Sequence, residues 1–295
     1  MAKANPEDLP TGPTSLRVII GSNLRRLREA ADISREDAAD EIRASASKIS
    51  RVELGRVSFR LRDVRDLMKM YGVQDEEEIE RFVDMAREAN QPSKWHRYND
   101  FLPDWFGNYL DMEGASSRIR TYEVQVIPGL LQNEEYARAV MLLGYGHTPL
   151  KEIDKRIEVR IKRQEILDRE DNQPELWAVI DEAALHRPFG GLGVMRGQIK
   201  SLIESCDKPN VRIQIVPFSA PGSHAGGGAP FTWLRFAYEE LKDVIYLEHL
   251  TGGLYLERDN EIDTYQAVME HLCVQAVQPH KTQDLLDKFL RDHYS

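Results

Sequence analysis

Cysteine is scarce in this chain, and long apolar runs are missing. Only Cys206 and Cys273 are cysteines among 295 residues, and they lie far apart, with no second cysteine or histidine at ligand spacing. The sequence therefore predicts buried free thiols and no metal site. No stretch reaches the roughly 20 apolar residues of a membrane span, and the first residues lack the apolar core of a signal peptide. We expect a cytoplasmic protein without membrane contact.

Positive charge is also in short supply, except in one segment. The chain has 39 Lys and Arg against 49 Asp and Glu, which gives a net charge of -10. Its apolar content of 41% is typical of a soluble globular protein, and its length of 295 residues predicts more than one domain. Residues 15–72 alone carry 13 basic against 9 acidic side chains. A locally basic module on an acidic chain is typical of a protein that reads DNA with one domain only.

The basic segment contains the pattern of two short helices joined by a tight turn. Ser34 and Ser45 stand where N-caps are expected, and each precedes a helical pattern. Small apolar residues, Ala38 and Ala39, allow a second helix to cross closely, and Ile49 and Val52 anchor that second helix inward. The pattern predicts a helix-turn-helix whose second helix faces DNA.

The outward positions of the second helix are the predicted DNA contacts. We expect Arg51 and Lys48 to make the main groove contacts, with Ser47 and Ser50 assisting. Arg35 and the amide end of the helix at Ser45 are expected to hold phosphates, and Arg56 is a further predicted DNA contact. With such contacts the protein is expected to associate with the nucleoid. Glu53 is expected to be structural and to pair with a nearby arginine.

This segment resembles the Cro/cI-type (XRE family) helix-turn-helix. The resemblance rests on Lys48 to Arg51, Glu53 and Gly55, and it extends to the flanking positions Leu24, Leu27, Arg28, Glu29, Asp63, Val64, Leu67, Tyr71 and Gly72. It implies an all-α, five-helix domain that binds double-stranded DNA as a homodimer, on an inverted-repeat operator.

Two departures from the family pattern affect the expected geometry. Arg35 replaces the usual Gln, which favours a phosphate contact over a bidentate adenine contact. Arg43 replaces the turn Gly, so either a non-glycine residue adopts the left-handed conformation at a cost of about 1 kcal/mol, or the turn differs. Ala38 and Ala44 replace larger residues and predict a slightly underpacked module.

The rest of the chain alternates helix and strand patterns. We expect a flexible arm over residues 1–14, the helix-turn-helix domain over 15–73, a connector helix within 74–94, and a regulatory domain over 95–295. Strand patterns in that last domain cover 118–127, 176–180, 211–216, 231–236, 244–247 and 254–256, and helix patterns cover 151–170, 195–205, 259–276 and 281–292. This mixture predicts an α+β domain with a mixed sheet.

The C-terminal part carries a second resemblance. The segments that carry this resemblance are Ile119 to Glu123, Val126 to Gln132, Tyr136 and Ala137, Arg160 to Leu167, Asp181 to Leu185 and Tyr246 to Glu257. Together they resemble the uncharacterised domain that follows XRE modules in many actinobacterial, WhiJ-like regulators. Such regulators are often encoded beside a small partner protein. The resemblance implies a transcription factor whose C-terminal domain senses a ligand or docks a partner.

The sequence does not distinguish between ligand sensing and partner docking by the C-terminal domain. The aromatic segment 95–109 fits the lining of a ligand pocket or a packing seam between domains or subunits. In the sensing alternative, the candidate pocket residues are Trp95, Tyr98, Trp105, Trp177, His224 and Tyr255. In the docking alternative, an acidic domain binds a small basic partner, and the protein binds DNA only in that complex, as antitoxins do.

Enzymatic motifs are weak. The glycine-rich loop 221–230 lacks the Gly-Lys-Ser/Thr ending of a phosphate loop, and 189–193 lacks the rest of a dinucleotide fingerprint. Asp181 and Glu182 near His186 are adjacent on a strand pattern and would point to opposite faces. We therefore expect neither an enzyme nor a cofactor.

Overall fold

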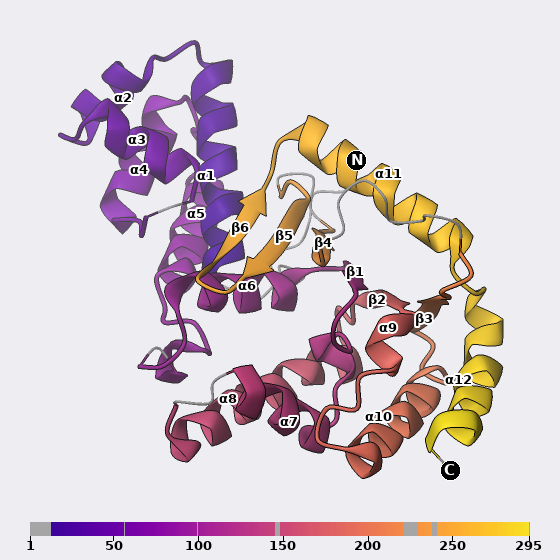
Figure 1. Cartoon of the computed structure of the whole chain (residues 1–295). Coiled ribbons are helices and arrows are strands. Elements are labelled where there is room, and N and C mark those ends of the chain that lie inside the picture. Colours follow the sequence, from indigo (N-terminus) through magenta and orange to yellow (C-terminus); the bar gives the residue numbers. More distant parts are fainter. Residues whose placement is uncertain are drawn as a thin grey trace. The chain divides into compact units, whose positions relative to one another are not determined.

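The computed structural model describes residues 13–55, 57–98, 100–144, 148–220, 229–237 and 241–294 (Figure 1). The chain divides into two compact units. The first holds the chain up to residue 98 together with Gly107–Ala115, and the second holds residues 100–106, Ser116–Arg235 and the chain from Asp243. Helix α6 (Asp104–Ala115) contributes residues to both.

The first unit is helical. Its helices are α1 (Pro13–Ala30), α2 (Arg35–Glu41), α3 (Ala46–Glu53), α4 (Leu61–Met70) and α5 (Glu76–Ala89), followed by a short 3₁₀ turn at His96–Tyr98. Each of the five helices turns an apolar stripe inward, and Leu24, Ala39, Ile49, Leu67 and Val83 meet in one buried core. Helix α5, expected from the sequence as a connector, thus shares the core of the helix-turn-helix.

Helix α1 begins two residues earlier than the sequence suggested. The expected flexible arm covered residues 1–14, of which 1–12 lie outside the described residues. Pro13 occupies the first position of α1 and Thr14 is already helical and buried. A proline is compatible with that position because the first amides of a helix have no intrahelical acceptor.

The second unit is built on a six-stranded mixed sheet, which confirms the predicted α+β architecture. Its strands are β1 (Arg118–Glu123), β2 (Glu175–Asp181), β3 (Val211–Val216), β4 (Phe231–Arg235), β5 (Val244–His249) and β6 (Gly252–Leu256). The strand order is β3-β2-β1-β4-β5-β6. Strands β1 to β3 run parallel, and β4, β5 and β6 join as successive antiparallel neighbours.

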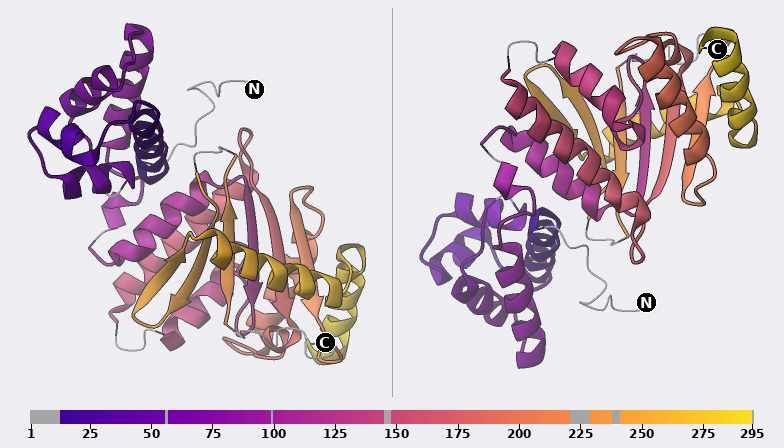
Figure 2. Two further views of the ribbon diagram at one scale, coloured as in Figure 1. Left: turned by 90° about the horizontal axis from the view of Figure 1, so that it is seen from above. Right: turned by 90° about the horizontal axis from the view of Figure 1, so that it is seen from below.

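Helices cover both faces of this sheet (Figure 2). Parallel strands need crossover connections, and these carry α7 (Glu134–Gly144), α8 (Leu150–Arg163), the short α9 (Glu182–Leu185) and α10 (Leu192–Ser205), with 3₁₀ turns at Gly129–Leu131 and Gln164–Asp168. Figure 2 shows α7, α8 and α10 on one face and α11 (Asp259–Gln275) crossing the other. The last helix, α12 (Pro279–Tyr294), contacts β3 and α10.

The two sheet faces have different chemistry. The face under α11 is an apolar core with Tyr122, Trp233 and Ile245, against which Met269 and Leu272 of α11 pack. Glu123 and Glu248 belong to the opposite face, because side chains alternate along a strand. Two carboxylates thus lie on the face that α8 covers, while two arginines, Arg120 and Arg212, lie over the ring of Trp177 on the α11 face.

Candidate functional site

Both helices of the helix-turn-helix begin at the predicted N-caps. The Ser34 hydroxyl accepts from the Asp37 amide at 3.0 Å, and the Ser45 hydroxyl accepts from the Lys48 amide at 3.2 Å. Each bond satisfies an amide that the helix itself leaves without an acceptor. The start of α3 is therefore fixed by its own sequence.

The turn between α2 and α3 resolves the question raised by Arg43. Its φ is 52°, in the left-handed region, so the first of the two alternatives is confirmed. The Arg43 amide donates to the carbonyl of Asp40 at 3.1 Å, and the Ala44 amide to that of Ala39 at 2.8 Å. These two bonds form a Schellman motif, which holds the turn although its left-handed residue has a side chain.

A buried carboxylate ties α3 to α1 and α2. The side chain of Glu53, at the end of α3, is only 2% exposed. It accepts from Arg28 Nε at 2.5 Å and from Arg35 Nε at 3.1 Å. The carboxylate raises the pKa of Arg28. Glu53 therefore has the structural role predicted for it, with two arginines rather than one.

Glycines bring the same helices into close contact. A Cβ atom on Gly21 of α1 would lie 2.4 Å from the Val52 carbonyl oxygen, and one on Gly55 would lie 2.7 Å from the Val18 amide nitrogen. Gly55 also has a φ of +65°. Both positions therefore require glycine, so the backbone of α1 fixes the end of α3.

The outward face of α3 matches the predicted contact surface. Ser47 and Arg51 are exposed and lie one turn apart, whereas Ile49 and Val52 are buried. Within the described residues, no hydrogen bond or ion pair involves Arg51. Ser50 is half-buried beside them.

Two other predicted contacts already have partners within the unit. Lys48 Nζ lies 2.8 Å from Asp63 Oδ2, and both side chains are partly buried. Arg35 uses its Nε on Glu53, while its side chain stays 42% exposed. Arg56 lies outside the described residues. Of the basic residues predicted to contact DNA that are described, Arg51 alone lacks a protein partner.

The residues proposed as a ligand pocket do not lie together. Trp95 and Tyr98 are buried in the first unit, with their ring centroids 6.1 Å apart. Trp177 belongs to the sheet face under α11, where Arg120 and Arg212 lie over its ring. His224 lies outside the described residues.

Trp105 and Tyr255 do meet, on the opposite face of the sheet. The Tyr255 hydroxyl donates to the Trp105 carbonyl oxygen. Trp105 also lines a pocket that encloses ≈ 450 Å³, including the part open to solvent. The pocket is lined by Leu102, Pro103, Trp105, Phe106, Met141, Arg156, Val159, Arg160 and Glu248. These residues come from α6 and the segment before it, α7, α8 and β5.

Sequence reasoning missed the charged groups of this pocket. Arg160 and Glu248 line the pocket, and Glu123 does not line it but interacts electrostatically with both. Nothing in the spacing of these residues along the sequence assigned them a role. Burial raises the pKa of Glu123 to about 8, and the Glu248 carboxylate adds to the rise, against the lowering effect of Arg160 and Arg163.

The residues considered for acid-base chemistry have structural roles. Asp181 caps α9 by accepting from the Ala183 amide at 2.8 Å. Glu182 accepts from the Phe218 amide at 2.7 Å and lies 3.3 Å from His186 Nε2. Burial raises the pKa of Cys206 and of Cys273 to about 11, which disfavours the reactive thiolates.

The described residues contain no group of three or more His, Cys, Asp or Glu side chains that could hold a metal ion. None of the described helices is both long enough and apolar enough to cross a membrane.

Comparison with known families finds one match in each part of the chain, although the second match begins within α6 and so includes Gly107–Ala115 of the first unit. Residues 106–288 match the family described as Domain of unknown function (DUF5753). The chain belongs to this family. Residues 19–82 match a helix-turn-helix domain, from within α1 to within α5. No curated protein and no solved structure matches the chain. The pocket described above lies mostly within the DUF5753 region, since only Leu102, Pro103 and Trp105 precede it.

Proposed function

We propose that this protein is a sequence-specific DNA-binding transcription regulator of the Cro/cI type, acting in the cytoplasm. The observation that carries the proposal is the outward face of α3, on which Arg51 is exposed and has no partner among the described residues. Lone exposed arginines are common, but this one lies on the second helix of a helix-turn-helix domain, where base contacts are made.

The rest of the domain supports this role. Glu53, Gly21 and Gly55 fix α3 on α1, so the outward face is presented on a rigid support. A single domain of this size makes few base contacts, and affinity and specificity rise when two copies bind half-sites a helical turn or a multiple of it apart. We therefore propose a homodimer on an inverted-repeat operator.

We assign the second unit a regulatory role, as in WhiJ-like regulators, and no catalytic role. Asp181 and Glu182 are engaged by backbone amides. The unit carries a pocket with aromatic and charged walls, which favours regulation by a small molecule. Docking of a small partner protein, encoded by a neighbouring gene, is the alternative.

The test is genome-wide recovery of DNA bound by the wild type, by Arg51→Ala and by Arg87→Ala. Arg87 lies in the last turn of α5 and pairs with Asp84, so its replacement removes the same charge away from α3. We expect discrete sites that share an inverted repeat, lost with Arg51→Ala and kept with Arg87→Ala. Arg51→Ala should weaken binding by about 1 to 3 kcal/mol.

Equal recovery with wild type and Arg51→Ala would disprove the role of α3. Repeating the recovery with and without the neighbouring gene distinguishes the partner alternative, because only that alternative makes DNA binding depend on the second protein.

A further inference from the structure

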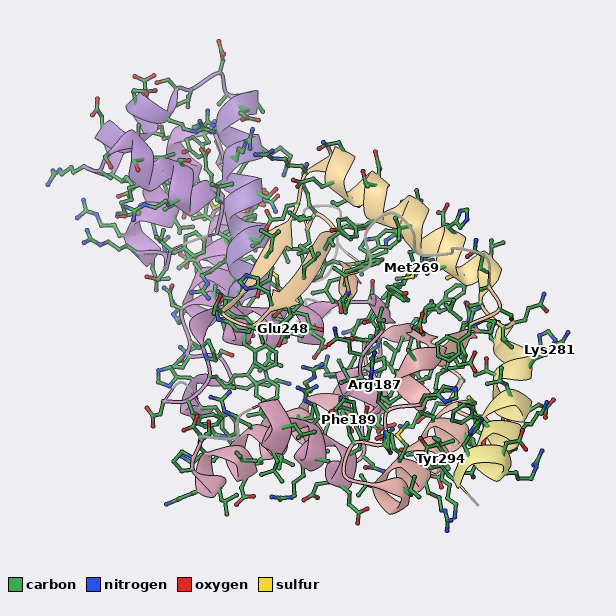
Figure 3. The ribbon with its side chains drawn as sticks, viewed as in Figure 1. Arg187, Phe189, Glu248, Met269, Lys281 and Tyr294 are labelled. Carbon is green, nitrogen blue, oxygen red and sulfur yellow. The ribbon has the colours of Figure 1, made fainter. Side chains whose placement is uncertain are left out.

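The pocket in the second unit has a flat aromatic wall next to a carboxylate. A Cβ atom on Gly253 would lie 3.1 Å from Trp105 Cε3 and 2.6 Å from Tyr246 Cε2, so the indole lies over a strand position that has no side chain. Glu248 is the neighbour of Gly253 across the β5–β6 pair. Figure 3 labels Glu248 at the end of β5 nearest α8. Trp105 and Glu248 thus form adjoining parts of one wall.

The positive charges of the pocket are engaged by the protein itself. Arg156 Nη2 lies 2.8 Å from Glu152 Oε1 and donates to the Phe101 carbonyl oxygen at 2.7 Å. Arg160 lies against the backbone of Gly129, where a Cβ atom would come within 2.3 Å of its Nη1. Both side chains also serve as walls of the pocket.

The negative charges are less well compensated. The Glu248 carboxylate accepts from the Tyr246 hydroxyl at 3.2 Å, and no salt bridge to it occurs within the described residues. Glu123 has no hydrogen bond or ion pair anywhere in the described parts of the chain. Continuing the β1–β4 pairing by one residue and the β4–β5 pairing by two places Glu123 and Glu248 in one row, two strands apart, or roughly 10 Å between Cα atoms.

We propose that this pocket binds a small organic cation, with its aromatic or apolar body on Trp105 and Phe106 and its ammonium group at Glu248, the wall carboxylate that shares a row of the sheet with Glu123. An ammonium supplies the charged donor that Glu248 lacks, and aromatic faces attract cations. This inference names the ligand class for the regulatory role proposed above and rests on that role.

Proton release accompanies binding. The groups that face Glu123 are Glu248 on β5, Arg160 and Arg163 on α8 and Tyr136 on α7. With a pKa of about 8, Glu123 holds a proton at neutral pH. An ammonium at the site favours the carboxylate, so Glu123 gives up that proton to the buffer.

The experiment is titration calorimetry of the full chain with benzylamine, benzyl alcohol and benzoate at pH 7, in two buffers of different ionisation enthalpy. We expect saturable binding of benzylamine alone, with a heat that differs between the buffers because a proton is released. Glu248→Gln should weaken binding about tenfold or more, as expected for the loss of a charge-assisted hydrogen bond. Glu123→Gln should abolish the buffer dependence.

Glu175→Gln is the matched control, because Glu175 is an exposed carboxylate on β2 of the same sheet that does not line the pocket. It should bind benzylamine as the wild type does. Binding of benzoate instead of benzylamine would overturn the proposal in favour of an anion site formed by the arginines, and absence of binding by all three probes would also overturn it.

DNA binding is measured separately on the same preparations. Loss of operator binding with Arg51→Ala but no benzylamine binding refutes only this inference. Benzylamine binding without any operator binding refutes only the proposed DNA-binding function.

Discussion

Removing the Glu53 carboxylate should destabilise the helical unit far more than removing an exposed one. Glu53→Ala deletes the bonds to Arg28 Nε at 2.5 Å and to Arg28 Nη2 at 3.3 Å. It leaves an arginine whose side chain is 8% exposed with only a 3.5 Å contact to Glu29, a carboxylate that is itself 51% exposed. Breaking a buried pair by removing one partner costs about 3 to 5 kcal/mol. The Arg35 bond adds little, because that side chain is 42% exposed.

Hydrogen exchange followed by mass spectrometry measures this loss in the full chain, peptide by peptide. About 3 kcal/mol corresponds to about a hundredfold faster exchange of the protected amides in α1 and α3. The control is Asp66→Ala, which breaks a pair with Arg62 whose side chain is 81% exposed, and should cost less than about 1 kcal/mol. Equal effects of the two variants would refute the reasoning.

A double variant separates lost charge from lost packing. Glu53→Leu combined with Arg28→Met replaces the buried pair by apolar side chains, so no buried charge is left unpaired, and Arg35, which also loses its bond to Glu53, is 42% exposed to solvent. Such replacements are often neutral or stabilising, and most of the protection in α1 should return. Failure to recover any protection would mean that the ion pair itself, rather than an uncompensated charge, determines stability.

Three further predictions follow from single contacts. Asp63→Asn frees Lys48 from its 2.8 Å ion pair, so fluorescence anisotropy should show tighter operator binding and a salt slope steeper by about one unit, and an unchanged slope would count against a DNA contact by Lys48. Arg43→Gly relieves the left-handed φ of 52° and should stabilise the helical unit by about 1 kcal/mol in the same exchange assay, whereas faster exchange would contradict that strain. Because the pKa of Glu123 is raised to about 8 from 4.5, the folded state holds a proton that the unfolded state releases, so stability is lost as pH rises from about 4.5 to 8. Urea unfolding monitored by tryptophan fluorescence should show that Glu123→Gln removes a slope of at most about 1.4 kcal/mol per pH unit, and identical slopes for variant and wild type would exclude this linkage.

Local rules account for what the sequence predicted best. The N-caps Ser34 and Ser45 and the inward residues Ile49 and Val52 depend on neighbours within a few positions, so their roles could be read from the sequence. The sequence alone does not decide whether Arg43 adopts the left-handed conformation, because the free-energy cost of that conformation is small enough for the surrounding hydrogen bonds to offset it.

Long-range pairing explains what the sequence could not provide. The Lys48–Asp63 ion pair depends on how α4 meets α3, and no periodicity encodes that meeting. Trp177 lies on the α11 face of the sheet, because strand register decides on which face a strand side chain lies. Trp105 belongs to helix α6 and lies over Gly253 on the opposite face, a contact that depends on how α6 packs on the sheet. The pocket draws on segments about 150 residues apart, so its charged wall had no signature in sequence spacing.

Each of the two proposed sites has an ionisable side chain, Arg51 or Glu123, that forms no ion pair within the described residues. The two side chains differ in their exposure to water. Arg51 is exposed, so water solvates its guanidinium and the folded state loses little by keeping it without a partner. Glu123 is largely withdrawn from water, so its charge is avoided by protonation at neutral pH. DNA binding at Arg51 therefore replaces water and counterions and should weaken with salt, whereas cation binding at Glu248 releases the proton of Glu123 and should strengthen as the pH rises toward 8.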